Sequence, residues 1–203
     1  IVHGGAGQDG LYGGYGDAIL EGGAGDDRLD PSAGSDRIDG GEGSDTMRVQ
    51  GFYTLPGDDA LQHGGATVDL GAGTVMRGDF LEDTFTSIEN IDATGDPDTL
   101  IGNASDNTFW GAEGGDHIDG AAGMDTVVYS GDSRNEWGVS VLLDRGYAQG
   151  ADGTGDILIS IENVIASPFD GDVLVGTGGT NHLSGNSGRD KLAGLAGDDA
   201  LED

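Results

Sequence analysis

Oxygen-bearing side chains recur in this 203-residue chain at multiples of nine residues, each following a glycine-rich segment. Glycine leaves the backbone free to turn its carbonyl groups toward a common point. Six to eight oxygen ligands in a forgiving geometry suit Ca²⁺, whereas Mg²⁺ demands a strict octahedron. The pattern therefore predicts several calcium sites. The predicted ligands are Asp9, Asp27, Asp36, Asp45, Asp98, Asn107, Asp116, Asp125, Asp172, Asn181, Asp190 and Asp199.

A nine-residue frame places all twelve ligands at its sixth position. The frame starts at Gly4 and runs through five tandem copies to Arg48, and it returns at Ala93 and at Ser167 for four copies each. The exception at the sixth position is Ala18 in the second copy. Thirteen nonapeptides thus fall into three arrays, and tandem copies of this kind are typical of repeat architectures.

The eighth position of every copy is apolar. One inward apolar residue between outward neighbours is the pattern of a three-residue strand, and the six residues before it form a turn. Two nonapeptides then make one coil of about 18 residues, and stacked coils pair their strands into two parallel sheets. We therefore predict an all-β fold, a parallel β-roll (β-solenoid) of stacked nonapeptide turns with two β-strand connectors. The eighth-position residues are Leu11, Leu20, Leu29, Ile38, Met47, Leu100, Phe109, Ile118, Val127, Leu174, Leu183, Leu192 and Leu201.

Successive turns of such a roll lie on opposite sides, so the ligands of one ion should come from sixth positions 18 residues apart. The site beside Ala18 is expected to be the weakest, because only the neighbouring Asp17 can assist Asp36 there. The predicted pairs are Asp9 with Asp27, Asp27 with Asp45, Asp98 with Asp116, Asn107 with Asp125, Asp172 with Asp190, and Asn181 with Asp199.

Two nonapeptides, GGAGDDRLD at residues 22–30 and GGEGSDTMR at residues 40–48, match the pattern G-G-x-G-x-D-x-U-x. In this respect the chain resembles the repeat-in-toxin (RTX) family of calcium-binding proteins. The resemblance covers the three arrays. It implies a bacterial protein that leaves the cell by type I secretion, unfolded in the calcium-poor cytoplasm and folded outside.

The chain divides into arrays at residues 1–48, 93–128 and 167–203, separated by connectors at residues 49–92 and 129–166. The connectors do not follow the nonapeptide frame, yet they resemble each other at a constant offset of 73 residues. A larger unit is therefore duplicated. Alternating apolar residues in both connectors suggest strands that extend or cap the sheets of the roll.

The motif SIEN occurs once in each connector, at Ser87–Asn90 and at Ser160–Asn163. The favoured interpretation is a strand that leads into the next array, with the isoleucine buried and the glutamate facing outward. The alternative is that acidic residues of this region add calcium ligands at the array entrance. These residues are Asp83, Glu89, Asp156 and Glu162.

Composition restricts the possible partners. Asp and Glu outnumber Lys and Arg by 38 to 8, and the formal charge is −30. Such a chain repels nucleic acid and anionic membrane surfaces, and its partners should be calcium ions. No apolar run is long enough for a membrane span. Without cysteine there is neither a disulfide nor a thiolate metal site.

We therefore expect a non-enzymatic, extracellular or cell-surface repeat region, of a fibre or adhesin-like protein, that folds on binding calcium. A catalytic carboxylate pair is not favoured, because each aspartate already has a place in the repeat. End-to-end self-association into filaments, or contact with other surface proteins, is a further expectation. The alternative is a carboxy-terminal secretion and stabilising module of a secreted hydrolase, lyase or toxin. The absence of a secretion signal at Ile1 is interpreted as the mark of a fragment.

Overall fold

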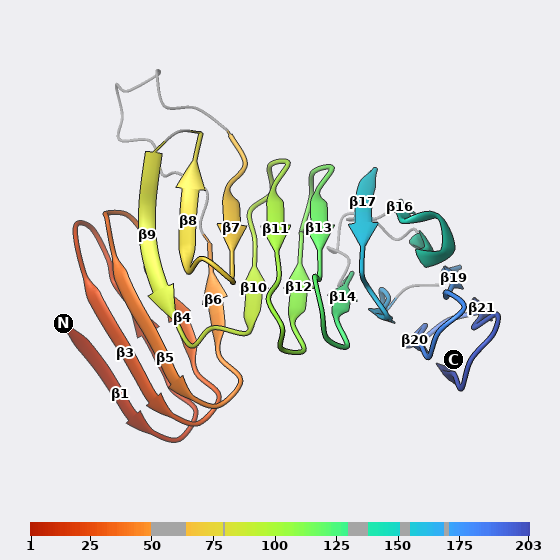
Figure 1. Cartoon of the computed structure of the whole chain (residues 1–203), viewed down its shortest axis with the longest axis horizontal. Helices are drawn as coiled ribbons and strands as arrows, with labels where there is room; N and C mark the ends of the chain where they lie inside the picture. Colours follow the sequence, from red (N-terminus) through yellow and green to blue (C-terminus); the bar gives the residue numbers. More distant parts are fainter. Residues whose placement is uncertain (50–63, 79, 130–137, 151–154, 169–170) are drawn as a thin grey trace.

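In the computed structural model of the chain, the regular secondary structure consists almost entirely of strands, arranged in two sheets (Figure 1). The first sheet has 13 strands and the second has 9. Within the described part of the chain, the one helix is a short 3-10 turn, η1 (Leu143–Arg145). No described helix has the length and apolar character needed to cross a membrane. The described residues are 1–49, 64–78, 80–129, 138–150, 155–168 and 171–203.

The strands are short, and both sheets run along the whole roll. In spatial order the first sheet contains β1 (Val2–Ala6), β3 (Ile19–Ala24), β5 (Arg37–Glu42), β9 (Phe80–Thr86), β8 (Thr74–Arg77), β7 (Thr67–Asp69), β11 (Thr99–Ile101), β13 (His117–Asp119), β17 (Asp156–Ile159), β16 (Tyr147–Gln149), β15 (Ser140–Leu142), β19 (Val173–Val175) and β21 (Lys191–Ala193). The second contains β2 (Gly10–Tyr12), β4 (Arg28–Asp30), β6 (Thr46–Arg48), β10 (Asn90–Asp92), β12 (Thr108–Trp110), β14 (Thr126–Val128), β18 (Asn163–Ile165), β20 (His182–Ser184) and β22 (Ala200–Glu202).

Strand pairing within the arrays is parallel and joins residues 18 apart. Leu11 pairs with Leu29 in the second sheet, and Leu20 pairs with Ile38 in the first. One coil therefore consists of two nonapeptides, with one strand in each sheet. The predicted parallel β-roll is confirmed.

The eighth-position residues form the core between the sheets, as predicted, and eleven of the thirteen are at most 2% exposed. The two exceptions lie in the last coil. Leu192 is only partly buried and Leu201 is 48% exposed, because β21 and β22 are edge strands that no further strand covers. The core is only one residue deep per turn, so it provides little apolar burial for its length.

Glycine permits the close stacking of the turns in the first array. Gly23 has φ +117°, and a β-carbon there would overlap the carbonyl oxygen of Gly5 in the preceding coil. Only glycine satisfies both requirements without strain. Strands β1, β3 and β5 are also five or six residues long here, because the Gly-Gly pairs continue the extended backbone into the turn.

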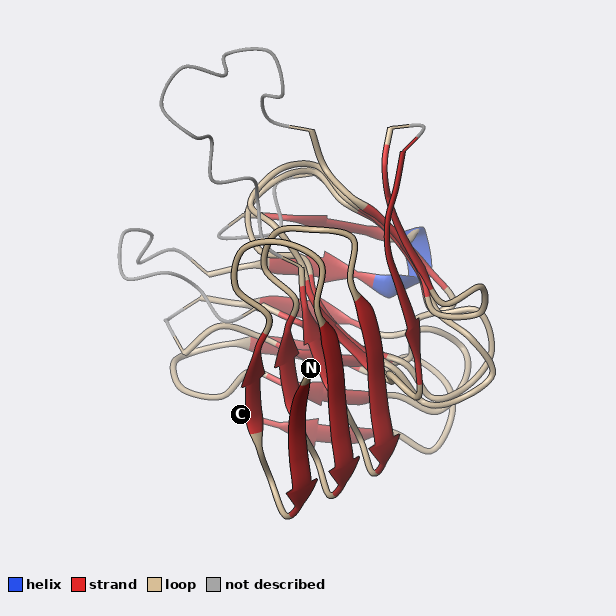
Figure 2. Ribbon diagram, turned by 90° about the vertical axis from the view of Figure 1, so that its left-hand side faces the viewer, coloured by secondary structure: helices blue, strands red, loops and turns tan. Residues whose placement is uncertain are grey.

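Each connector contributes three strands to the first sheet and one to the second, whereas a coil of the arrays contributes one to each. In the first connector β8 runs antiparallel to both β7 and β9, and in the second β16 runs antiparallel to both β15 and β17. The two extra first-sheet strands of each connector account for the unequal widths of the sheets, and the connectors therefore extend the roll. Two strands added on one side splay the coils there by roughly 10 Å. In Figure 2 the strands of the later coils accordingly lie at a steep angle to the N-terminal strands in front of them.

The SIEN motif forms a turn and not the predicted strand. Ser87 and Ser160 adopt left-handed conformations, with φ 54° and 51°, and the following strand begins only at the Asn of the motif. The predicted burial of the isoleucines is confirmed, with Ile88 2% and Ile161 4% exposed. The strand pairing shows that this turn is short. Phe85 pairs with Ile38 in the first sheet, and Ile91, only six residues later, pairs with Met47 in the second.

Candidate metal sites

Backbone hydrogen bonds bring the six predicted ligand pairs together. The N–H of Asp9 donates to Oδ1 of Asp27 at 2.9 Å, and the N–H of Asp27 donates to Oδ1 of Asp45 at 2.8 Å. The same bond runs from Asp98 to Asp116 (2.8 Å), Asn107 to Asp125 (2.8 Å), Asp172 to Asp190 (2.9 Å) and Asn181 to Asp199 (3.0 Å).

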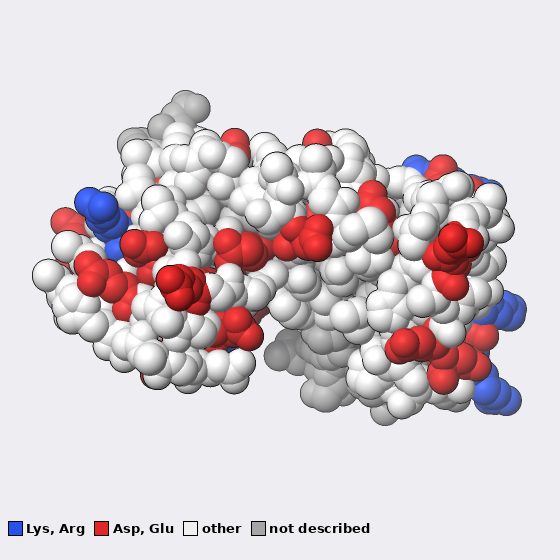
Figure 3. All heavy atoms as spheres, turned by 60° about the horizontal axis from the view of Figure 1, so that its bottom comes forward, with Lys and Arg blue, Asp and Glu red and all other residues white. Residues whose placement is uncertain are grey.

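The paired residues form two rows, each on the turns that lead into one sheet. We call these rows the first-sheet ladder and the second-sheet ladder. The turns that lead into the second sheet lie along the lower side of Figure 1, and Figure 3 shows exposed acidic side chains on the face seen there, whereas Asp27, Asp45 and Asp125 of the ladder itself are buried. The second-sheet ladder consists of Asp9, Asp27, Asp45, Glu89, Asn107, Asp125, Glu162, Asn181 and Asp199. The first-sheet ladder consists of Asp36, Asp83, Asp98, Asp116, Asp156, Asp172 and Asp190.

Seven ladder aspartates hold a buried carboxylate oxygen that has no hydrogen-bond partner among the described residues. An unpaired buried polar atom costs about 1–3 kcal/mol, and more when it is charged. A cation in the turn would remove this cost, so the donor set fits a hard metal ion such as Ca²⁺. The unpaired atoms are Oδ2 of Asp9, Asp27, Asp36, Asp45, Asp116, Asp125 and Asp190.

Burial also raises the pKa of several ladder carboxyl groups. It raises the pKa of Asp116 to about 8 and that of Asp83 to about 7, and the like charges of Asp156 and Glu82, respectively, add to the effect. The pKa values of Asp125 and Asp172 rise to about 6 for the same main reason. A divalent cation would oppose this shift, because it favours the ionised form. Burial likewise raises the pKa of Asp36, Asp45 and Asp98.

The first turns of the second and third arrays differ, because other protein groups already satisfy their ladder side chains. Oδ2 of Asp98 accepts hydrogen bonds from the backbone N–H and the hydroxyl of Thr94, both at 2.9 Å. The hydroxyl of Ser167 lies 3.2 and 3.3 Å from the two carboxylate oxygens of Asp172. These hydroxyl groups provide hydrogen bonds to carboxylate oxygens of Asp98 and Asp172.

Both ladder asparagines are satisfied as well. Asn107 accepts from the N–H of Asn103 at 3.0 Å through Oδ1 and donates through Nδ2 to the carbonyl of Glu89 at 3.0 Å. Asn181 makes the equivalent bonds to Thr177 at 2.7 Å and to Glu162 at 2.8 Å. The four satisfied residues, Asp98, Asn107, Asp172 and Asn181, stay predicted calcium ligands, but none has an unpaired oxygen.

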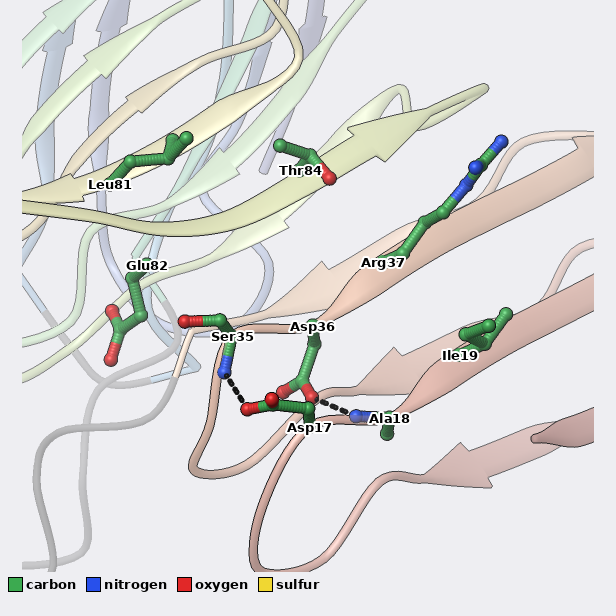
Figure 4. A pocket seen from close by; sticks show the side chains of 9 residues that line it. All are labelled: Asp17, Ala18, Ile19, Ser35, Asp36, Arg37, Leu81, Glu82 and Thr84. Carbon is green, nitrogen blue, oxygen red and sulfur yellow. Dashed lines mark hydrogen bonds between the residues drawn. The ribbon is translucent and has the colours of Figure 1, made fainter.

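The turn beside Ala18 opens into a pocket of about 490 Å³ (Figure 4). Oδ1 of Asp36 accepts from the N–H of Ala18 at 2.6 Å, and Oδ1 of Asp17 accepts from the N–H of Ser35 at 3.0 Å. Both carboxylates line the pocket, and the assistance of Asp17 to Asp36 in holding an ion stays a prediction. Ala18 contributes no oxygen from its side chain, so this turn has one ladder carboxylate fewer than its neighbours.

The connector acids occupy ladder positions. Oε2 of Glu89 accepts from the N–H of Asp45, and Oε2 of Glu162 accepts from the N–H of Asp125, both at 3.0 Å. The expectation that these glutamates face outward is therefore wrong. The duplicated SIEN motif was the sequence signal that marked them.

Among the described residues no three metal-ligating side chains form one cluster. Each candidate site therefore has two ladder carboxylates at most, and backbone carbonyls of the glycine-rich turns must supply the remaining oxygens. This division of ligands is compatible with calcium, which accepts carboxylates and carbonyl oxygens together.

Coils of two nonapeptides with aspartates paired across successive turns define a calcium-binding parallel β-roll. A family model, the RTX calcium-binding nonapeptide repeat (4 copies), matches residues 12–47, 92–127 and 170–201, just over half of the chain. The chain therefore belongs to the RTX calcium-binding nonapeptide repeat family, whose repeats bind several calcium ions. No curated protein matches the chain.

Proposed function

We propose that this chain is a calcium-dependent structural region of a type I secreted bacterial protein, serving outside the cell as part of a surface, fibre or adhesin-like assembly. The observation that carries the proposal is the set of buried, unpaired Oδ2 atoms in the turns. Such atoms are tolerable in a folded protein when a cation satisfies them.

The free energy of metal binding becomes free energy of folding in this scheme. Bound calcium supplies positive charge and oxygen coordination in the turns. Without it, closely spaced carboxylates repel one another, and a core one residue deep per turn does not offset the entropy of ordering the chain. The net charge of −30 adds to this repulsion.

The strongest sites lie between ladder neighbours that both keep an unpaired oxygen. Asp9, Asp27 and Asp45 are consecutive members of the second-sheet ladder, and all three have an unpaired Oδ2. Asp27 thus belongs to two sites, one with each neighbour. Affinities of about 0.1–1 mM, usual for extracellular modules, would keep the chain unfolded before export and folded after it.

A structural role at the surface fits the arrangement better than catalysis. The ladder gives each of these aspartates a place in the stacking of coils. Strands β1, β2, β21 and β22 are the edge strands of the two sheets, and unpaired edges favour end-to-end association of rolls.

Far-ultraviolet circular dichroism across a calcium titration tests this proposal. The spectrum should change from disordered to β-structured as calcium is added, and magnesium at equal ionic strength should be much less effective. A β-structured spectrum that persists in excess chelator would refute the dependence on calcium. Electron microscopy with and without calcium tests the proposed end-to-end association.

A further inference from the structure

The nonapeptide frame stops at Arg48 and again after residue 128, yet the hydrogen-bond pattern of the ladders continues. Asp36 has no sixth-position residue 18 places later, and its N–H donates instead to Oδ1 of Asp83 at 2.8 Å. In the next array the N–H of Asp116 donates to Oδ1 of Asp156 at 2.9 Å. A connector carboxylate thus replaces the missing aspartate of the first-sheet ladder.

The second-sheet ladder continues in the same way, with glutamate in place of aspartate. The N–H of Asp45 donates to Oε2 of Glu89, and that of Asp125 donates to Oε2 of Glu162, both at 3.0 Å. Across the SIEN turn, the core residue Ile91 follows the core residue Phe85 by six positions, whereas successive core residues of the nonapeptides are nine positions apart. The additional methylene of glutamate compensates for the shorter turn, because it lets the carboxylate reach the preceding coil.

The duplication provides an independent repetition of this geometry. Asp156 and Glu162 follow Asp83 and Glu89 by the same 73 residues, and the corresponding hydrogen bonds agree within 0.1 Å. Two separate junctions therefore use the same pair of residue types for the same purpose.

The array aspartate at each junction also has an unsatisfied buried oxygen. Oδ2 of Asp36, Asp45, Asp116 and Asp125 has no hydrogen-bond partner, and these four residues are at most 3% exposed. Each therefore holds a buried, unpaired carboxylate oxygen next to a second carboxylate from the connector. Two adjacent carboxylates with an orphaned oxygen are unfavourable when both are ionised, unless a cation lies between them.

We propose that each connector is fastened to the preceding array by calcium held between the last ladder aspartates of the array and the connector carboxylates. This proposal rests on the calcium-dependent folding proposed above. The four junction sites are Asp36 with Asp83, Asp45 with Glu89, Asp116 with Asp156, and Asp125 with Glu162. The connectors, which contain no nonapeptide, are then part of the calcium-dependent unit and not passive spacers.

Replacement of Glu89 and Glu162 by glutamine distinguishes two roles of these side chains, which are metal binding and acceptance of a backbone hydrogen bond. Glutamine keeps a side-chain oxygen that can accept the N–H bond of Asp45 or Asp125, but it lacks the negative charge that makes a carboxylate the stronger calcium ligand. The test compares the full-length double variant Glu89→Gln/Glu162→Gln with a control of equal charge, Glu42→Gln/Glu113→Gln, whose glutamates are exposed third-position residues. Bound calcium per chain is measured by equilibrium dialysis at saturation.

The junction variant should bind two fewer ions per chain than the control. Equal numbers in both variants would overturn the junction sites, while failure of the unmodified chain to bind calcium at all would instead overturn the proposed function. Hydrogen exchange on the unmodified chain gives a second readout that does not depend on the folding of a variant. Strands β9 and β17 should gain protection over the same calcium range as β5 and β13, and protection of β9 and β17 in chelator would contradict the proposal.

Discussion

The side-chain amide of Asn107 donates a 3.0 Å hydrogen bond to the backbone carbonyl of Glu89 in the preceding coil. Asp45 and Asp125 in the same ladder each carry a carboxylate with an unpaired oxygen, whereas this position carries its own donor. The amide therefore connects two coils without an ion. Coils immediately after a connector are thus stabilised by side chains of the protein itself.

The substitution Asn107→Asp should strengthen the calcium site predicted between residues 107 and 125. It removes the donor to Glu89, which costs about 1 kcal/mol at low calcium, and it adds a carboxylate beside Glu89 and Asp125. Equilibrium dialysis across a calcium titration should show this site filling at a lower calcium concentration than in the unmodified chain. The control Asn107→Ala loses the same hydrogen bond and supplies no side-chain oxygen, so its site should be weaker. Equal calcium affinity in Asn107→Asp and Asn107→Ala would contradict the assignment.

The substitution Asp27→Asn should weaken two sites at once, because Asp27 is hydrogen-bonded to Asp9 on one side and to Asp45 on the other. Loss of the charged ligand should destabilise the calcium-bound roll by about 1.5–3 kcal/mol. The midpoint of folding in a calcium titration should move to a higher concentration. The control Asp26→Asn changes the same charge at an exposed neighbouring position, so equal shifts for both variants would count against the role of Asp27.

Calcium binding should strengthen as the pH rises from about 5 to about 8. The raised pKa values of Asp116 (about 8), Asp83 (about 7) and Asp125 (about 6) mean that the metal-free roll holds protons that the unfolded chain has lost. The metal-free roll is therefore favoured by acid and loses stability as the pH rises through these values, while the ions must displace the protons. In excess chelator, acidification from about pH 8 to about pH 5 should therefore increase the β-structure of the metal-free chain, as measured by circular dichroism. A chelated chain whose spectrum shows no such gain would contradict the shifted values.

Truncation of a core residue should raise the calcium requirement although it touches no ligand. Phe109 is completely buried, and Phe109→Ala should cost about 3–5 kcal/mol. Since folding and binding are coupled, the loss should appear as a higher calcium midpoint. Leu201→Ala, at a position that is 48% exposed, serves as the control and should have a small effect. Similar midpoints for both variants would argue against the apolar core.

The repeat made most of the arrays predictable from sequence. A nine-residue period with an apolar eighth position sets the length of one coil at 18 residues. The pairing of Asp9 with Asp27, 18 residues apart, could therefore be predicted. The predicted burial of the eighth-position residues is wrong only at Leu192 and Leu201. These residues lie on edge strands, and the repeat does not determine whether another strand covers an edge.

The connectors were predictable only in outline. Their alternating residues indicated strands, but the antiparallel insertion of β8 between β7 and β9 depends on pairings that no period encodes. The hydrogen bond of Glu89 to the preceding coil depends on the short turn that begins at Ser87, and the left-handed conformation of that serine has no sequence signature. Likewise, the sequence pattern predicts for Asn107 the same ligand role as for the aspartates, whereas in the structure its side chain is hydrogen-bonded to Asn103 and Glu89.

A crystal structure of the chain grown with calcium tests the central claim most directly, through anomalous difference maps. The account predicts a peak in the turn between Asp27 and Asp45, within about 2.3–2.6 Å of carboxylate and carbonyl oxygens. A folded roll whose aspartate turns show no metal peak at saturating calcium would contradict it.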